Sequence, residues 1–322
     1  MFYVIDYLKA LACLLILNFH SEPLYPDNLS VLAFGGDFGN NIFFAVSGFT
    51  LFSSISQTKF SKFFQWYGKR LIKLFPILVI FYICSISFGF YKIINVQEFV
   101  EICIFPTPYW FTGAILVFYP LLFIFGKIEW RFTFFAATMI LFVLYFIVGG
   151  QYAERYVIVF FAMTAGYTLR SYLTKNEYRQ LKVGIQYVIA LILALIGYIG
   201  FKLLLMKGID YYGIVMLFVG LMTVLLAIIL IYCGYVKNEQ LRKISEKHKF
   251  MYRFVVMMSK VTLPVYLLQV FGNRLIIKEI NNYFMFPISL LLCFVSIILV
   301  AWLITQADGL IRSLFQNRRV KQ

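Results

Sequence analysis

The sequence predicts an all-α, polytopic integral membrane protein with about ten transmembrane helices. Three observations predict this: the 322 residues are 62% hydrophobic and 13% charged, the apolar runs are long and continuous, and positive charge alternates between the connections. Ordinary soluble domains are about half apolar and about a quarter charged, so a water-soluble fold could not bury this much apolar surface. Backbone groups in lipid need a helix or a closed barrel, and continuous runs lack the alternation of barrel strands.

The expected helices are the apolar runs that can cross a bilayer. A hydrocarbon core about 30 Å thick takes about 20 helical residues. The second run is short, which a tilted span or a locally thinned bilayer would accommodate. The ten expected spans are residues 4–20, 41–55, 74–91, 111–126, 131–149, 155–172, 183–205, 212–236, 261–277 and 284–307. We expect one membrane domain over residues 1–322, without a fused extracytoplasmic domain.

Lys and Arg residues predict the orientation of these spans. With the N-terminus inside, the inner segments hold 22 of them and the outer segments six, as the positive-inside rule requires. Both termini are then cytoplasmic, and the Lys-rich inner loop at 237–260 is expected to attract anionic membrane lipids. The expected location is a cell membrane, namely the plasma membrane of a bacterium.

Two kinds of partner are not expected. The net charge of +15 is spread over connections rather than gathered on one domain, so membrane orientation explains it better than nucleic acid does. The five cysteines lie in or near apolar runs, without CxxC spacing or a nearby His cluster. Neither a disulfide framework nor a metal site is therefore predicted.

The first span carries the sharpest polar pattern. Asp6, Lys9, Cys13 and His20 share one helix face within an arc of about 60°, and Lys9 and His20 lie about 16 Å apart along the axis. In one interpretation Asp6 pairs with Lys9 and His20 ends the helix among headgroups. In the other the face is functional, because ionisable groups inside a span are costly and usually face the protein interior or a water-filled cavity. The pattern alone leaves both open.

Further motifs follow in a specific order along the chain. They are "IDYLKALACLLILNFH" (5–20), "GGDFGNNIFFAVSGF" (35–49), "YGKRLIKLFP" (67–76), "YWFTGAILVFYPLLF" (109–123) and "SKVTLPVYLLQ" (259–269). Each is weak alone, but together they resemble membrane-bound acyltransferase family 3, whose members transfer acyl groups to sugars and related acceptors. Two departures are Lys73, where the family pattern has a second Arg, and Gln269, where many relatives carry His.

The resemblance implies a donor site and a catalytic base. The donor would be acyl-CoA, usually acetyl-CoA, loaded from the cytoplasm, with its phosphates neutralised by Lys69, Arg70, Lys73 and Lys9. Lys73 can hold a phosphate as a point charge but cannot form a bidentate fork. His20 would act as general base on an acceptor hydroxyl, since the unperturbed pKa of histidine is about 6.5. An acyl-His intermediate stays open.

The acceptor implied by the resemblance is a sugar or glycan, lipid-linked or surface-exposed. Candidates to position it are polar or aromatic residues near the expected outer face, and each has a structural alternative: a helix-packing hydrogen bond, a solvated loop carboxylate, or an aromatic anchor in the headgroup layer. The candidates are Asp37, Asn41, Ser47, Trp110 and Tyr266, together with Asn18 and Asn40.

Two other functions are compatible with a polar face inside a helical bundle. One is a transporter or flippase that moves a lipid-linked glycan or small solute without bond chemistry. The other is a sensor or assembly subunit that has kept the scaffold and lost activity. The Lys9 to His20 spacing and the basic start of the third span favour the acyltransferase, because a carrier has no general need for both.

Overall fold

The computed structural model describes residues 2–87, 110–148, 153–176, 183–206 and 212–319, and this part of the chain is all-α. It contains eleven α-helices and three 3-10 helices: η1 (Glu22–Leu24) and η2 (Asp27–Leu32) between α1 and α2, and η3 (Phe60–Lys62) between α2 and α3. The α-helices are α1 (Tyr3–His20), α2 (Gly36–Gln57), α3 (Phe63–Ser87), α5 (Trp110–Lys127), α6 (Arg131–Ile147), α7 (Ala153–Lys175), α8 (Ile185–Met206), α9 (Tyr212–Val236), α10 (Asn238–Lys247), α11 (Lys249–Tyr283) and α12 (Ile288–Arg319).

The helices confirm the predicted polytopic membrane protein. Within the described residues, each of the ten expected spans falls on one helix, and α10 is an additional short helix. Residues 88–91 of the third expected span and residue 149 of the fifth lie outside the described residues. In the described part of the chain, six helical stretches are long and apolar enough to cross a membrane, and α6 and α8 contribute shorter apolar stretches. The six are Tyr3–His20, Asp27–Gln57, Trp110–Lys127, Leu217–Val236, Lys249–Gln269 and Ile288–Leu310.

Several helices extend beyond the predicted apolar runs. The predicted loop at 237–260 is instead α10 followed by the first turns of α11, and α2 begins at Gly36, so Asp37 lies in a helix rather than in a connection. The basic residues before the third span lie on the first turns of α3, which begins at Phe63 and runs through Pro76. The physical reason is that Lys, Arg, Gln and Glu are good helix formers, so a helix can continue past the apolar run.

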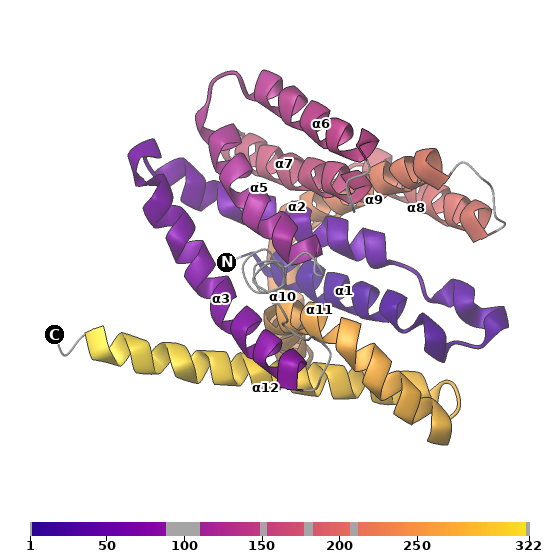
Figure 1. The fold of residues 1–322 in the computed structure, drawn as a ribbon. Coiled ribbons are helices and arrows are strands. Elements are labelled where there is room, and N and C mark those ends of the chain that lie inside the picture. Colours follow the sequence, from indigo (N-terminus) through magenta and orange to yellow (C-terminus); the bar gives the residue numbers. More distant parts are fainter. Residues whose placement is uncertain (1, 88–109, 149–152, 177–182, 207–211, 320–322) are drawn as a thin grey trace.

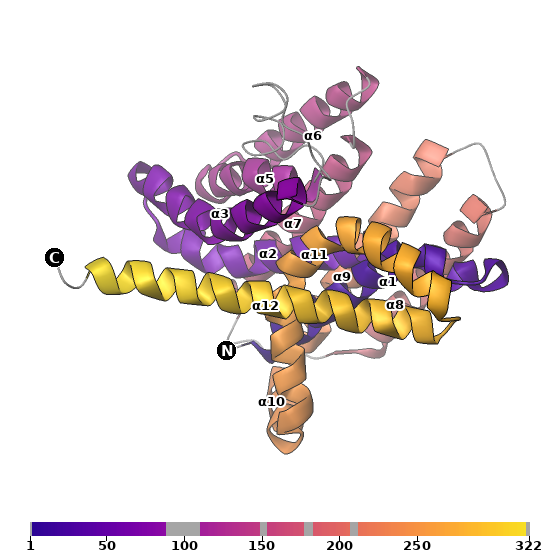
Figure 2. The ribbon, with the colours of Figure 1, turned by 60° about the horizontal axis from the view of Figure 1, so that its bottom comes forward.

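The helices form two groups around α2. Figure 1 shows α5, α6 and α7 together on one side of α2, while α1, α11 and α12 lie on the other. Figure 2 shows α10 projecting away from the body of the bundle, past α12. The main core gathers large apolar side chains of α2, α5 and α7, such as Phe44, Phe118 and Phe160, which lie edge to face or tilted against one another.

Two glycines let α2 and α7 cross closely. A Cβ added to Gly48 would lie 1.9 Å from the carbonyl oxygen of Met163, and one added to Gly166 would lie 2.0 Å from that of Ala45. Neither position can hold a side chain without moving a backbone. Small residues at such crossings let membrane helices approach and gain van der Waals contact, since lipid supplies no hydrophobic drive between helices.

Successive long helices alternate in direction, which gives the bundle two chemically different ends. We call one the basic end: it holds the start of α1, the α2–α3 and α5–α6 junctions, and α10. Here the backbone N–H of Tyr3 donates to Asn238 Oδ1 at 2.8 Å, and Lys127 Nζ donates to the carbonyl oxygen of Ser56 at 3.2 Å. We call the other the His20 end: it holds the end of α1 and the starts of α2, α5 and α7. The orientation of these ends across a membrane stays a prediction.

Candidate functional site

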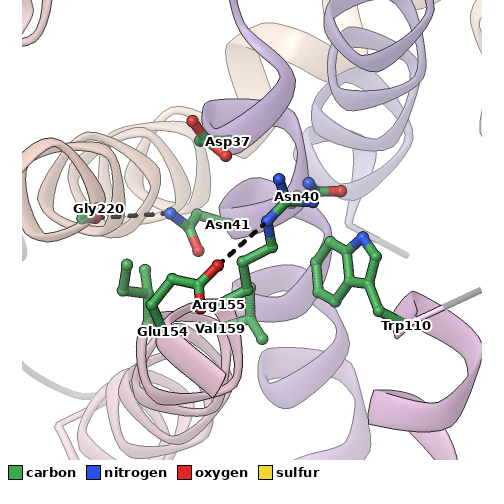
Figure 3. A pocket seen from close by; sticks show the side chains of 9 residues that line it. Asp37, Asn40, Asn41, Trp110, Glu154, Arg155, Val159 and Gly220 are labelled. Carbon is green, nitrogen blue, oxygen red and sulfur yellow. Dashed lines mark hydrogen bonds and ion pairs between the residues drawn. The ribbon is translucent and has the colours of Figure 1, made fainter. Parts of the chain in front are cut away.

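A pocket lies at the His20 end, where the starts of α2, α5 and α7 meet α9 (Figure 3). Its empty space is about 360 Å³ with the open mouth included. We call it the outer pocket. It is lined by Asp37, Asn40, Asn41, Trp110, Glu154, Arg155, Ile158, Val159 and Gly220.

The Gly-rich motif builds the entry to α2 beside this pocket. Gly35 has φ 103°, a left-handed conformation that favours glycine, and it precedes the first residue of α2. A Cβ on Gly39 would lie 2.8 Å from the carbonyl oxygen of Ala12, and one on Gly36 would lie 2.6 Å from the ring of Phe19. The motif therefore holds the start of α2 against the last turns of α1, and this brings Asp37, Asn40 and Asn41 to the His20 end.

Asn18 fastens the segment that leads into this motif. Its Nδ2 donates to the carbonyl oxygens of Leu32 at 2.8 Å and Phe34 at 3.1 Å, and its Oδ1 accepts from Tyr25 Oη at 2.5 Å. Burial raises the pKa of the Tyr25 phenol, so this hydroxyl remains a proton donor at neutral pH. With both ends of its amide engaged, Asn18 holds the loop over the end of α1.

Asn41 presents an unpaired oxygen to the outer pocket. The hydroxyl of Thr223 donates to its own helix at the carbonyl oxygens of Val219 and Gly220, so Thr223 can only accept from Asn41. The Asn41 amide nitrogen accordingly donates to Thr223 Oγ1 at 2.7 Å, with a longer contact of 3.5 Å to Gly220 O, and Figure 3 shows the amide oxygen pointing away from Gly220. Asn41 is 1% exposed and its Oδ1 has no hydrogen-bond partner.

Asn40 adds a second such acceptor. Its Oδ1 is also buried without a hydrogen-bond partner, and Asn40 directly precedes Asn41 in α2. A buried acceptor left unsatisfied costs about 1–3 kcal/mol. Two such acceptors in one pocket favour a ligand that donates hydrogen bonds to them.

Three charged side chains complete the lining. Arg155 lies 3.9 Å from Glu154, a long contact between side chains that are each 35% exposed, and its guanidinium lies over the Trp110 ring at 5.4 Å (Figure 3). Asp37 is the third charge, in the first turn of α2. The pocket therefore carries two carboxylates and one guanidinium.

His20 lies at the same end of the bundle, as the last residue of α1. Its ring is partly buried and meets the Phe19 ring edge to face, with centroids 5.2 Å apart. The charge of Arg155 is near enough to His20 to interact with it electrostatically. His20 does not itself line the outer pocket.

The predicted donor-binding residues lie away from the outer pocket. Lys69 and Lys73 are exposed on the first turns of α3, and Arg70 is partly buried with its guanidinium 5.6 Å from the centre of the Trp66 ring. The Arg70 charge also acts on Tyr119 of α5, which places Arg70 at the α3–α5 seam. Lys9 is partly buried, in the half of α1 nearer to the basic end.

The Asp6–Lys9 pair of one of the two interpretations does not form: the two described side chains make no ion pair within 4 Å. Asp6 instead accepts hydrogen bonds from Tyr252 Oη at 2.9 Å and Ser259 Oγ at 3.0 Å, both on α11. The reason is tertiary, because a carboxylate between packed helices is better satisfied by two fixed hydroxyls than by a flexible lysine one turn away. This interpretation of the α1 face was wrong for Asp6.

The remaining candidates separate by their surroundings. Trp110 lines the outer pocket, as do Asp37 and Asn41, whereas Ser47 and Tyr266 are buried outside it. Tyr266 stacks on Phe111 with ring centroids 4.0 Å apart, a contact that joins α11 to α5.

Sequence reasoning missed Glu154 and Arg155. An adjacent acid and base at the start of an apolar run was the available signal. Which residues would share a pocket depended on how α2 and α7 cross.

The whole set of helices can now be compared with known proteins. The model of a family described as an acyltransferase domain, Acyl_transf_3, matches residues 2–306. The chain belongs to this acyltransferase family. Searches of curated proteins and of solved structures found no significant match. As a membrane-bound acyltransferase, the protein requires an acyl donor and an acceptor, and the matched region contains both the basic start of α3 and the outer pocket.

Proposed function

We propose that this acyltransferase moves an acetyl group from cytoplasmic acetyl-CoA to a hydroxyl of a cell-surface glycan or glycan precursor, in the plasma membrane of a bacterium. The observation that carries the proposal is the division of chemistry within the family-matched region. Cations lie toward one end of the helices, and an imidazole beside a hydrogen-bonding pocket lies at the other. A donor with phosphates and an acceptor with hydroxyls need these two environments.

The donor would bind from the basic end. Arg70, Lys69 and Lys73 offer charge-assisted hydrogen bonds to the CoA phosphates. Arg70 is the strongest candidate, because packing on Trp66 restrains its side chain and its planar fork can bind phosphate oxygens in pairs. Lys9 lies further along the same route, about 16 Å from His20 on one face of α1. The pantetheine arm would extend along that face.

The acceptor would react at the His20 end. His20 takes the proton of the acceptor hydroxyl, directly or through a water molecule, as the hydroxyl oxygen attacks the acetyl carbonyl carbon. The carbonyl π electrons move to oxygen and return as the C–S bond breaks. The sulfur of CoA leaves as a thiolate and takes up the proton that His20 received. The products are an acetyl ester and CoA, and His20 is restored.

The histidines of the chain supply a matched test. The protein has two, and His248 is exposed at the other end of the bundle. Surface glycans should be compared by mass spectrometry in cells with the normal gene, a deletion, His20→Ala and His248→Ala. We expect alkali-labile acetyl groups to disappear in the deletion and in His20→Ala, and to persist in His248→Ala, with both variants at normal levels in membranes.

A loss of about 10²- to 10⁴-fold in His20→Ala is the size expected for a missing general base. Normal acetylation by His20→Ala would show that the base is another group. A glycan whose transport changes in the deletion while its acetylation does not would favour the transporter or flippase instead. Binding of acetyl-CoA to the purified protein separates these two classes directly.

A further inference from the structure

Two amide oxygens in the outer pocket lack hydrogen-bond partners. Asn40 Oδ1 and Asn41 Oδ1 are buried acceptors without partners, and the carboxylates of Asp37 and Glu154 line the same pocket. The orientation of the Asn41 amide follows from its bonds to Thr223 and Gly220, so its oxygen rather than its nitrogen is left to the pocket. A ligand that satisfies these two oxygens must bring hydrogen-bond donors.

The charges of the pocket set a second condition. Asp37 and Glu154 are negative, and Arg155 has its guanidinium face against Trp110 and Glu154 within 3.9 Å. An added carboxylate or phosphate would be attracted by Arg155 but would meet two like charges and two unpaired oxygens. An added ammonium group would meet one like charge, that of Arg155. An uncharged ligand meets no like charge in this lining.

We infer that the outer pocket binds a neutral, hydroxyl-rich ring, such as an uncharged sugar, and discriminates against sugars that carry a carboxylate or phosphate. The inference rests on the proposed function, because it identifies this pocket as the place where the acceptor binds. Hydroxyl groups of the ring donate to Asn40 and Asn41, and the carboxylates of Asp37 and Glu154 accept from others. Discrimination comes from unfavourable charge contacts with the wrong sugar as well as from favourable ones with the right sugar.

The test uses two probes that differ at a single position. Methyl β-glucoside carries a CH₂OH group where methyl β-glucuronide carries a carboxylate. Binding of each to the full-length protein in lipid nanodiscs is measured by saturation-transfer difference NMR. We expect the glucoside to bind at least about ten-fold more tightly than the glucuronide, a difference that corresponds to about 1.4 kcal/mol.

Variants locate the binding in the pocket. Asn40→Ala removes one unpaired acceptor and should weaken glucoside binding about five-fold. Asn176→Ala, the same change directly after the end of α7 and away from the pocket, should leave glucoside binding unchanged. The double variant Asp37→Asn, Glu154→Gln keeps side-chain size and removes both negative charges. This double variant should bind the glucuronide and the glucoside equally tightly, whereas a misfolded variant would bind neither.

Three results would overturn the inference: equal or tighter binding of the glucuronide by the natural protein, no measurable binding of either probe, or equal effects of Asn40→Ala and Asn176→Ala. Failure of the proposed function looks different. If the glucoside binds as expected but the protein neither binds acetyl-CoA nor acetylates glycans, the sugar preference of the pocket is supported and the proposed acetyl transfer is rejected. If acetylation depends on His20 but the sugar preference is reversed, the proposed acetyl transfer is supported and the inference about the outer pocket is rejected.

Discussion

The two ends of this bundle are built from the same helices, yet they gather different polar groups. At the basic end, cations lie against aromatic rings: Arg70 over Trp66 at 5.6 Å, and Arg170 over Phe2 at 4.5 Å. At the His20 end, Arg155 also lies over an aromatic ring, Trp110, at 5.4 Å, but the outer pocket adds two carboxylates and two amide oxygens without partners. One end is suited to an anion and the other to a donor of hydrogen bonds.

The comparison shows how a few polar residues give the two ends of one helical bundle different chemistry. A cation–π contact stabilises a guanidinium through its face and leaves the edge able to bind phosphate oxygens. Buried amide oxygens lower stability until a ligand pairs with them. Helices that run from one end to the other, such as α1 with Lys9 and His20, connect the two environments.

The largest expected effect comes from the crossing that holds the outer pocket together. Gly166→Ala places a methyl group 2.0 Å from the Ala45 carbonyl oxygen, so α7 must move away from α2 and the pocket between them must open. We expect the variant to accumulate poorly in membranes or to unfold at a much lower temperature, since overpacking costs about 1–3 kcal/mol or more.

The matched control for this crossing lies at the basic end. An added Cβ at Gly68, on α3, meets no atom within 4 Å. Gly68→Ala should therefore leave the unfolding temperature unchanged or raise it, because alanine favours a helix by about 1 kcal/mol over glycine. Equal unfolding temperatures for Gly166→Ala and Gly68→Ala would contradict the close α2–α7 crossing.

The next effect separates the ligands of the two ends. Arg70→Ala should weaken acetyl-CoA binding about ten-fold, the loss of one charge-assisted contact, and leave methyl β-glucoside binding unchanged. Isothermal titration of both ligands measures this. Lys62→Ala, an exposed cation of η3, is the control and should alter neither. Loss of glucoside binding in Arg70→Ala would mean that the ends are not independent.

A smaller effect distinguishes the ends by ionic strength. The Debye length falls from about 30 Å at 0.01 M to about 3 Å at 1 M salt. Acetyl-CoA binding at the exposed Lys69 and Lys73 should weaken several-fold over this range. Binding of the uncharged glucoside should stay constant when both are titrated in the same nanodisc preparation. A salt-dependent glucoside would argue against a neutral ligand in the outer pocket.

The smallest effects concern the tyrosines that fasten α1 at each end. Tyr252→Phe removes a donor to the Asp6 carboxylate, and Tyr25→Phe removes one to the Asn18 amide. Such bonds between membrane helices average about 0.6 kcal/mol, and bonds to charged acceptors are the stronger ones. We expect both variants to unfold a few degrees earlier, with the larger shift for Tyr252→Phe. The reverse order would show that the His20-end loop limits stability.

The fold could be predicted well from the sequence, since hydrophobic length and charge alternation depend on the bilayer rather than on neighbouring helices. The ten predicted spans each fall on a helix. The ends of helices were less predictable, as the polar stretch from Lys237 shows, because helix propensity and tertiary contacts extend a helix beyond the membrane-crossing part.

The candidate site could be predicted only in part. Asp37, Asn41 and Trp110 were selected from motifs and do line the outer pocket, while Ser47 and Tyr266 lie outside it. Glu154 and Arg155 were not selected, because nothing in their local pattern indicates that α7 crosses α2 at Gly48 and Gly166.

The sequence by itself determined the class of the protein, the placement of the helices along the chain and the order of the motifs that mark the acyltransferase family. These features follow from residue-by-residue properties: apolarity, helical period and charge. The tertiary structure alone decided that Asp6 pairs with α11, that the Asn41 oxygen is left unpaired, and that Glu154 and Arg155 line the same pocket as Asn41. Those are distances between residues far apart in the chain, and only the packing of the helices determines them.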